Sequence, residues 1–503
     1  RVLIYGAGSA GTRLLASLQN SLEMEVVGFI DDDRRLQGRV INGVPIHALA
    51  EVPALVERRG VSSVLLAIPS LGRARRNQVL EQLRETGVHV RTLPGLTDIA
   101  LGRVQASDVR ELDIEDLLGR DPVQPRLDLM TRHTAGKVVL VTGAGGSIGA
   151  ELCRQIAAYR PRRLVLFESS EYALYRIEEE FRQRFSEVAT LPVIGDVKDA
   201  ARVRSVIARE RPSMVLHAAA YKHVPLMEVH NAWEAARNNI LGTWTVAQAS
   251  ADLGIERFVL VSTDKAVNPT SVMGATKRFA EIILQALDAR QRGTRFCMVR
   301  FGNVLASSGS VVPLFTQQIR AGGPVTVTHP EVRRYFMTIP EAASLVLQAE
   351  AMARGGEVFL LDMGQPVRIA ELAERMIALS GLSLRTRDNQ DGDIEIRYTG
   401  LRPGEKLFEE LLIGENVAGT EHPMIMRALE HSPGWPDVEG WLLELRVAIE
   451  QLDCARTQQL LLRAVREYQP KDPLHDLVWR RDATRGESSV SLLRAVPPSS
   501  ASR

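Results

Sequence analysis

The chain has 503 residues, of which 45% are hydrophobic and 24% are charged, and its formal net charge is +1. This composition is typical of a globular protein long enough for two or three domains, and it excludes the disordered and fibrous classes. No long run of one charge sign appears, which argues against nucleic acid as a partner. The three cysteines have no metal-ligand spacing, so we predict no metal site.

The sequence also bears on membrane contact. No apolar stretch approaches the roughly 20 residues that span a bilayer, and no signal-peptide pattern opens the chain. We therefore expect this chain alone to be soluble. Because Arg1 already lies inside a strand-like run, we also expect a further segment upstream.

Residues 1–100 have the pattern of a small parallel α/β unit. The alternation of apolar runs and turns predicts one helix, at 12–18, and strands at 1–5, 26–30, 64–68 and 88–93. Gly6, Gly8 and Gly11 follow the first strand and acidic residues 31–33 follow the second, as in a dinucleotide-binding fingerprint. Two alternatives stay open for this unit, a bound nucleotide or a Rossmann-like fold used for regulation or packing.

The same pattern starts again after a connecting arm predicted at residues 101–135. A helix is predicted at 150–158, and strands at 137–142, 164–167, 191–194, 214–217, 258–262 and 296–300. The predicted fold class is therefore α/β, with two Rossmann-like doubly wound parallel-sheet units. The predicted domains are 1–100, the arm, a catalytic domain at 136–415 with a substrate-capping subdomain from about 310, a C-terminal helical region at 416–480 and a disordered tail at 481–503.

The second glycine-rich turn predicts the cofactor site. Glycines at 143, 146 and 149 permit a tight turn against a pyrophosphate, and Glu168 at the end of the next strand favours NAD over NADP by repelling a 2′-phosphate. Further strand ends place an acid near the adenine and small residues near the cofactor. The predicted NAD contacts are Gly143, Gly146, Ser147, Ile148, Gly149, Glu168, Asp196, Val197, Ala218, Ala220 and Lys277.

The loop after residues 214–217 lies at the carboxyl edge of the predicted sheet, where ligands bind in such folds. Its Lys222 is predicted to contact phosphate or sugar. His217 and His223 are either catalytic or simply hydrogen-bonded at the end of a strand.

A catalytic strip is indicated by Ser262-Thr263-Asp264-Lys265 followed by Met273-x-x-x-Lys277. The short-chain dehydrogenase/reductase superfamily places Tyr at the position of Met273, since residues at i and i+4 share one helix face. A thioether cannot exchange a proton during turnover. Either the chain is no longer an enzyme, or Thr263, Asp264 and Lys265 replace the phenol.

The strip combines with motifs around Lys222, Asn303 and residues 401–406 into a specific pattern. The pattern resembles the membrane-associated UDP-N-acetylglucosamine 4,6-dehydratases of bacterial polysaccharide and glycan biosynthesis, over about residues 1–415. The resemblance implies an NAD-dependent hydro-lyase that takes a UDP-sugar. It also implies a homo-oligomer that the missing upstream segment holds at the cytoplasmic side of the inner membrane. Met273 would then mark a subtype of this family.

The resemblance also implies roles for individual residues. Lys265 would be the base at sugar C5 and Asp264 the acid at C6, with the C4 hydroxyl proton taken by Thr263 or Asp264. Lys277 would hold the nicotinamide ribose, and with the cofactor's charge it would keep Lys265 neutral, while burial would keep Asp264 protonated. The implied substrate contacts are Lys222, Asn303, Arg334, Arg402 and Glu405.

Three alternatives remain. A 5-epimerising dehydratase differs little in sequence. A 4-epimerase needs no Asp-Lys pair and normally keeps the Tyr. A non-catalytic, NAD-responsive scaffold would be consistent with Met273 but would not require Asp264, Lys265 and Lys277.

Overall fold

The computed structural model describes residues 1–18, 24–68, 79, 82–83, 88–92, 110–111, 124–380, 382–410, 417–428, 430, 432–451 and 453–471. The predicted disordered tail and most of the predicted connecting arm lie outside the described residues. Among the helices that are described, none has both the length and the hydropathy needed to cross a bilayer.

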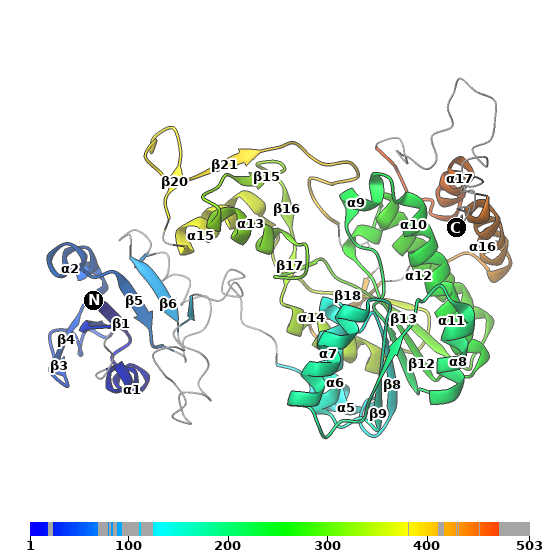
Figure 1. Cartoon of the computed structure of the whole chain (residues 1–503), viewed down its shortest axis with the longest axis horizontal. Helices are drawn as coiled ribbons and strands as arrows, with labels where there is room; N and C mark the ends of the chain where they lie inside the picture. The colour runs from blue at the N-terminus through cyan, green and yellow to red at the C-terminus, as the bar shows by residue number, and fades with distance from the viewer. Residues whose placement is uncertain are drawn as a thin grey trace, which may run out of the picture.

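The first sheet is built around a parallel core at the N-terminus (Figure 1). Strand β1 (Val2–Tyr5) lies between β2 (Val26–Ile30) and β5 (Ser63–Leu66), and β5 pairs in parallel with β6 (His89–Thr92). These strands match the predicted ones. The remaining elements are the short strands β3 (Val40–Ile41), β4 (Val44–His47) and β7 (Arg110–Glu111), and the helices α1 (Ser9–Leu18) and α2 (Val52–Arg59).

The second sheet has nine strands in the order β10-β9-β8-β11-β12-β13-β18-β23-β22. The strands of its parallel part are β8 (Val138–Thr142), β9 (Arg163–Glu168), β10 (Thr190–Ile194), β11 (Met214–His217), β12 (Arg257–Val261), β13 (Arg295–Arg300) and β18 (Glu357–Leu361). The strand order reverses between β8 and β11. Ligands of doubly wound sheets bind in the crevice outside the strand ends at such a reversal, so the fold itself marks a site.

Helices cover both faces of this sheet (Figure 1). One face packs on α5 (Leu127–Thr131), α6 (Ser147–Ala158), α7 (Glu171–Arg184) and α14 (Ile339–Met352). The other packs on α8 (Ala200–Glu210), α10 (Ala232–Ala236), α11 (Thr243–Asp252), α12 (Val272–Arg290), α16 (Trp435–Glu450) and α17 (Cys454–Ala464). Burial on both faces explains why these strands are continuous apolar runs.

The prediction that residues 416–480 are wholly helical is wrong at the start of that range. Strands β22 (Val417–Gly419) and β23 (Ile425–Ala428) precede the two helices, and β23 pairs antiparallel with β18. Both strands are too short to show a clear alternation, and the residues of β18 that pair with β23 lie 64 to 70 positions earlier in the chain, so local pattern could not identify them. The sheet of the catalytic unit thus continues past residue 415.

A separate hydrophobic cluster lies under the segment predicted to cap the substrate. It joins α13 (Val311–Arg320), β15 (Val325–Val327), α15 (Ile369–Leu379) and β21 (Ile394–Tyr398). The neighbouring short strands pair as β14 (Asn303–Val304) with β17 (Phe336–Met337), β16 (Arg333–Arg334) with β19 (Val367–Arg368), and β20 (Leu384–Arg385) with β21.

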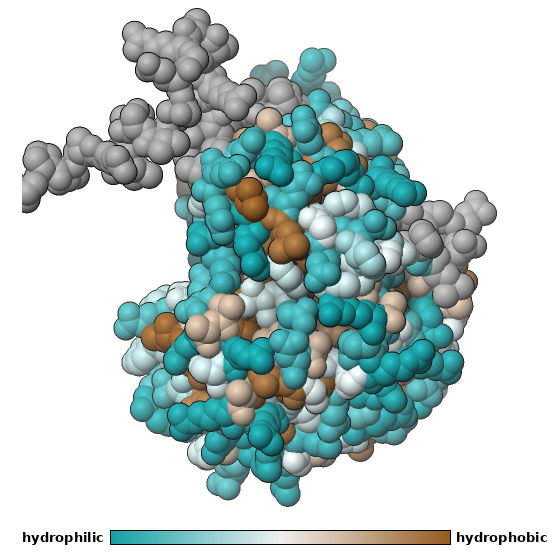
Figure 2. All heavy atoms as spheres, turned by 90° about the vertical axis from the view of Figure 1, so that its right-hand side faces the viewer, coloured by the Kyte–Doolittle hydropathy of each residue, from teal (hydrophilic) through white to brown (hydrophobic). Residues whose placement is uncertain are grey.

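The side of the molecule formed by the C-terminal helices is mostly hydrophilic, with small separate hydrophobic patches (Figure 2). Exposed apolar residues there include Leu443 and Val447 on α16 and Leu462 on α17. Scattered patches of this size are usual on a folded protein.

A buried ionic cluster joins strand β13 to helix α12. The guanidinium of Arg300 donates to Glu281 at 2.8 and 2.5 Å and to Glu430 at 2.6 and 2.8 Å. Burial alone would raise the pKa of Glu281, but Arg300 and Arg278 hold that pKa below its ordinary value. Glu281 also accepts from the Ser262 hydroxyl at 2.6 Å, so the cluster anchors the first residue of the predicted catalytic strip.

We predict that Arg300→Met destabilises the protein by about 3–5 kcal/mol, because it leaves two buried carboxylates to share the single cation of Arg278. Arg295→Met is the matched control, since Arg295 starts the same strand and is exposed. Unfolding in urea, monitored by tryptophan fluorescence, measures the free energy of unfolding of the two variants. Equal stability of the two variants would show that the cluster contributes nothing.

Candidate active site

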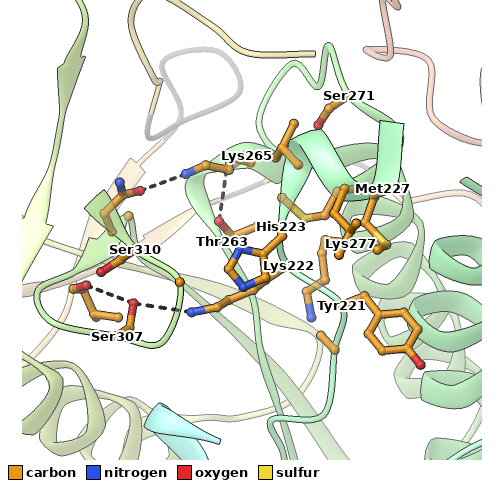
Figure 3. A pocket seen from close by; sticks show the side chains of 18 of the residues that line it. Tyr221, Lys222, His223, Met227, Thr263, Lys265, Ser271, Lys277, Ser307 and Ser310 are labelled. Atoms are coloured by element: carbon orange, nitrogen blue, oxygen red, sulfur yellow. Dashed lines mark hydrogen bonds between the residues drawn. The ribbon is translucent and has the colours of Figure 1, made fainter. Parts of the chain in front are cut away.

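A cleft of about 550 Å³ opens at the carboxyl ends of β8, β11 and β12. Its walls are the glycine-rich turn after β8, the loop after β11, the start of α12 and residues 402–409. Figure 3 shows Lys222, Thr263, Lys265 and Lys277 gathered around this space. The strand reversal and the predicted strip therefore meet in one place.

The glycine-rich turn folds tightly against its neighbours. Gly143 has φ +66°, and a Cβ there would lie 2.8 Å from the Ala219 amide; a Cβ at Gly149 would lie 2.0 Å from the Gly143 carbonyl. Side chains are therefore excluded, and Gly146 leads directly into α6. The residues from 146 to 149 line the cleft at the N-terminus of this helix, where backbone amides suit a pyrophosphate.

The acids predicted to contact the cofactor have local partners. Glu168, at the end of β9, accepts from the Gly145 amide at 3.1 Å, which places it beside the turn as a ribose-binding acid requires. Asp196 accepts from Lys198 and forms an ion pair with its amine at 2.9 Å. Val197 is buried in the core. Asp196 and Val197 do not line the cleft, so their contact with a cofactor stays a prediction.

The strip forms a compact hydrogen-bonded group in the turn η5 (Asp264–Ala266). The Thr263 hydroxyl donates to Asp264 Oδ1 at 2.9 Å. The Lys265 amine donates to the same oxygen at 3.0 Å and to Asn303 Oδ1 at 3.0 Å. Asp264 is fully buried and does not line the cleft, so Thr263 and Lys265 stand between its carboxylate and that space.

The expectation that Lys265 is neutral includes the charge of a bound cofactor, so it stays a prediction. Among the protein's own groups, burial would lower the pKa of the Lys265 amine, but the charges of Asp264 and Glu409 outweigh burial and raise that pKa above its ordinary value. Lys265 is therefore an ammonium in an ion pair with Asp264.

The first turn of α12 is pressed against the strip. The Ser271 hydroxyl accepts from the Gly274 amide at 3.1 Å, and Glu228 accepts from the Val272 amide at 2.5 Å. A Cβ at Gly274 would lie 2.2 Å from the Lys265 carbonyl, so only glycine permits this approach.

The close approach brings Met273 and Lys277 to the cleft wall. Met273 is 2% exposed and packs into the core behind the site. The Lys277 amine donates to the Val261 carbonyl at 2.7 Å, and burial lowers its pKa to about 8.

The residues predicted to contact substrate fall into two groups. Lys222 lines the cleft and reaches Ser307 at 3.4 Å, and Arg402 lines it with an exposed side chain. Burial, then Lys265, lowers the pKa of the Lys222 amine. Arg334 and Glu405 also line the cleft, but they bond to the protein itself: Arg334 donates to Glu405 at 3.0 Å and to the Lys406 carbonyl at 2.8 Å, which holds the 402–409 segment in place.

Glu409 is a cleft residue that sequence reasoning missed. Its side chain is 3% exposed and lies 3.9 Å from the Lys265 amine and 3.8 Å from the Arg334 guanidinium. The only signal in the sequence was its place three residues after the motif at 401–406.

His217 has a structural role. The Thr243 hydroxyl donates to the Asn239 carbonyl at 2.7 Å, so its oxygen accepts from His217 Nε2 at 3.1 Å. His217 Nδ1 then accepts from the Thr142 hydroxyl at 2.8 Å. Burial, and to a smaller extent Lys277, lowers its pKa to about 3. A neutral, fully bonded imidazole away from the cleft has no part in proton transfer there.

We predict that His217 makes stability fall with acidity. Below about pH 6.5, the ordinary pKa of histidine, the His217 imidazole binds a proton in the unfolded chain but stays neutral in the folded chain. Its contribution is complete above pH 6.5 and is lost as the pH falls toward 3. Between pH 6 and 4.5, His217→Gln should therefore flatten the stability curve by up to about 1.4 kcal/mol per pH unit. His230→Gln, at an exposed histidine, serves as the control. Equal slopes of the free energy of unfolding against pH in the two variants would contradict the prediction.

Comparisons with known proteins agree with the geometry. Residues 139–430 match the family model described as polysaccharide biosynthesis protein. A capsular polysaccharide biosynthesis protein, CapD, of Staphylococcus aureus is 46% identical over 82% of this chain and 68% of its own length. A UDP-glucose 4-epimerase of Rickettsia canadensis is 33% identical over 66% of this chain and 94% of its own length. A UDP-N-acetylglucosamine 4,6-dehydratase (inverting) of Campylobacter jejuni is 30% identical over 56% of this chain and 79% of its own length.

Proposed function

Because the chain belongs to the polysaccharide biosynthesis protein family, we propose that it catalyses the NAD-dependent 4,6-dehydration of UDP-N-acetylglucosamine for a bacterial surface polysaccharide or glycan. The observation that carries the proposal is the group formed by Thr263, Asp264 and Lys265 at the cleft. An epimerase has no leaving hydroxyl to protonate, so it does not need a paired acid and base. The Campylobacter relative, which is named for this reaction, supports the same assignment.

The cofactor that fits the cleft is NAD. Three observations support NAD: the glycine-rich turn leads into the N-terminus of α6 at the cleft, Glu168 accepts from the Gly145 amide beside this turn, and Lys277 lines the same cleft. Bound there, the nicotinamide supplies a reversible acceptor for the hydrogen at sugar C4. Lys222 and Arg402 offer cations to the substrate diphosphate, and Arg provides a forked donor for phosphate oxygens.

The first proton step runs through Thr263. Its hydroxyl faces the cleft and donates to Asp264, so it can take the C4 hydroxyl proton while passing its own proton to the buried carboxylate. No phenol is required for this relay. It leaves Asp264 protonated, so that this carboxyl can return a proton through the Thr263 hydroxyl to the departing C6 hydroxyl.

The second step follows from the first by electrostatics. The charge of Asp264 is the larger of the two that raise the pKa of Lys265. Once Asp264 is protonated, that attraction is gone, and burial again favours the neutral amine. Lys265 then becomes able to take the C5 proton. The resting ion pair is thus a state that oxidation at C4 converts into an acid and a base.

We predict that Lys265→Ala abolishes dehydration of UDP-N-acetylglucosamine, because no other amine lies beside Asp264 among the described residues. The measurement is the mass of the sugar product, which is lower than that of the substrate by one water in the unsubstituted protein. Lys198→Ala, at a lysine outside the cleft, is the control. Water loss by Lys265→Ala at the rate of the control would remove Lys265 from the mechanism. A product of unchanged mass from the unsubstituted protein would instead favour epimerisation.

We also predict that Met273→Leu keeps turnover within about threefold, because the side chain moves no proton. The swap conserves volume and should lower the stability of the fold by less than about 1.5 kcal/mol. Steady-state kcat measures this, with Thr263→Val as the contrast, since valine has the shape of threonine but no relay hydroxyl. If the kcat of Met273→Leu fell as far as the kcat of Thr263→Val, the thioether would have a chemical role.

A further inference from the structure

The following inference rests on the proposed function and concerns the proton that the Lys265 ammonium carries. The charged amine must lose this proton before it can act as a base at C5. Asp264 cannot take it, because the relay from Thr263 has just protonated that carboxyl. A second acceptor is therefore needed inside the cleft.

We propose that Glu409 is this acceptor, so that it stores the Lys265 proton during each turnover. The transfer breaks an N–H bond of Lys265 and forms an O–H bond on Glu409, with the electron pair left on nitrogen. The proton returns to Lys265 when the amine has given the C5 proton back to the product. Atoms and charges balance, and no further reactant is needed.

The geometry supports this role for Glu409. Its Oε1 lies 3.9 Å from the Lys265 amine, about 1 Å beyond hydrogen-bond distance, and a lysine side chain covers such a gap by rotation. Its Oε2 is buried and accepts no hydrogen bond from any described residue. An unsatisfied buried oxygen is costly, and a proton on this carboxyl would reduce that cost. The side chain lines the same cleft as Lys265.

The surrounding charges are consistent with a carboxyl that can accept and release a proton. Burial is the largest influence and raises the pKa of Glu409; Asp264 raises it further, while Lys265, Arg334 and Lys406 oppose the shift. Lys222 is a further cation near Lys265, because the charge of Lys265, after burial, lowers the pKa of the Lys222 amine. When Asp264 is protonated, Glu409 is the carboxylate that still pairs with the Lys265 amine among the residues that the structure describes.

The test compares Glu409→Gln, which keeps shape but cannot hold the proton, with Glu410→Gln, whose side chain is exposed. With UDP-N-acetylglucosamine and NAD at pH 7, the Glu409 variant should lose at least tenfold in kcat for water loss. The loss should shrink as pH rises, because Lys265 then releases its proton to solvent. Reduced nicotinamide, read by absorbance, should still form at the normal rate, since oxidation at C4 needs only Thr263 and Asp264.

Two further measurements separate the outcomes. Glu409→Asp should recover part of the rate, because it restores a carboxyl. Without any ligand, NMR titration of the Lys265 amine should show a lower pKa in Glu409→Gln, since a neighbouring negative charge has gone.

An unchanged pH profile in Glu409→Gln, or a rate loss that is equal at every pH, would overturn the proposal. If the unsubstituted protein removed no water from UDP-N-acetylglucosamine, the proposed function would be refuted instead. The ligand-free titration would still report on the contact between Glu409 and Lys265.

Discussion

The contact between Lys265 and Asp264 is the interaction on which the other features of the site depend. An isolated charge in a buried position is very unfavourable, and each of these two residues makes the other tolerable. Neighbouring groups complete the arrangement. Asn303 takes a second hydrogen bond from the amine, Thr263 donates to the carboxylate, and Gly274 allows α12 to close over the strip.

This arrangement explains how a methionine can occupy the place of a phenol. The Thr263 hydroxyl is positioned to link the cleft to a carboxylate that the cleft itself does not reach. In the proposed mechanism, removal of the C4 hydroxyl proton and delivery of a proton at C6 are one route through Thr263 and Asp264. A phenol at position 273 would duplicate the first half of that route. The side chain there is free to serve the core, where Met273 is found.

Sequence predicted those parts of the structure that local pattern determines. The strands of both parallel sheets are apolar runs that end at turns, and the glycines at 143 and 149 are required by backbone contacts too close for any side chain. The strip was recognisable because its members are adjacent or one helical turn apart. The fold class, with two doubly wound sheets, followed from these signals.

The parts that were missed depend on distant residues. Strand β23 exists because β18 offers it an edge, and Glu409 lies beside Lys265 although 144 positions separate them in the chain. The pKa of Lys265 depends on two carboxylates, of which only Asp264 was visible in the sequence. Arg334 has the residue type of a phosphate ligand, yet its donors hold the cleft wall in place.

The most direct test of the account uses UDP-N-acetylglucosamine that carries deuterium at C4, incubated with the unsubstituted protein and NAD in ordinary water. The proposed chemistry moves that deuterium to C6 of the same sugar while one water is lost, and mass spectrometry with NMR locates it. Deuterium that stays at C4 in a sugar of unchanged mass would contradict the account.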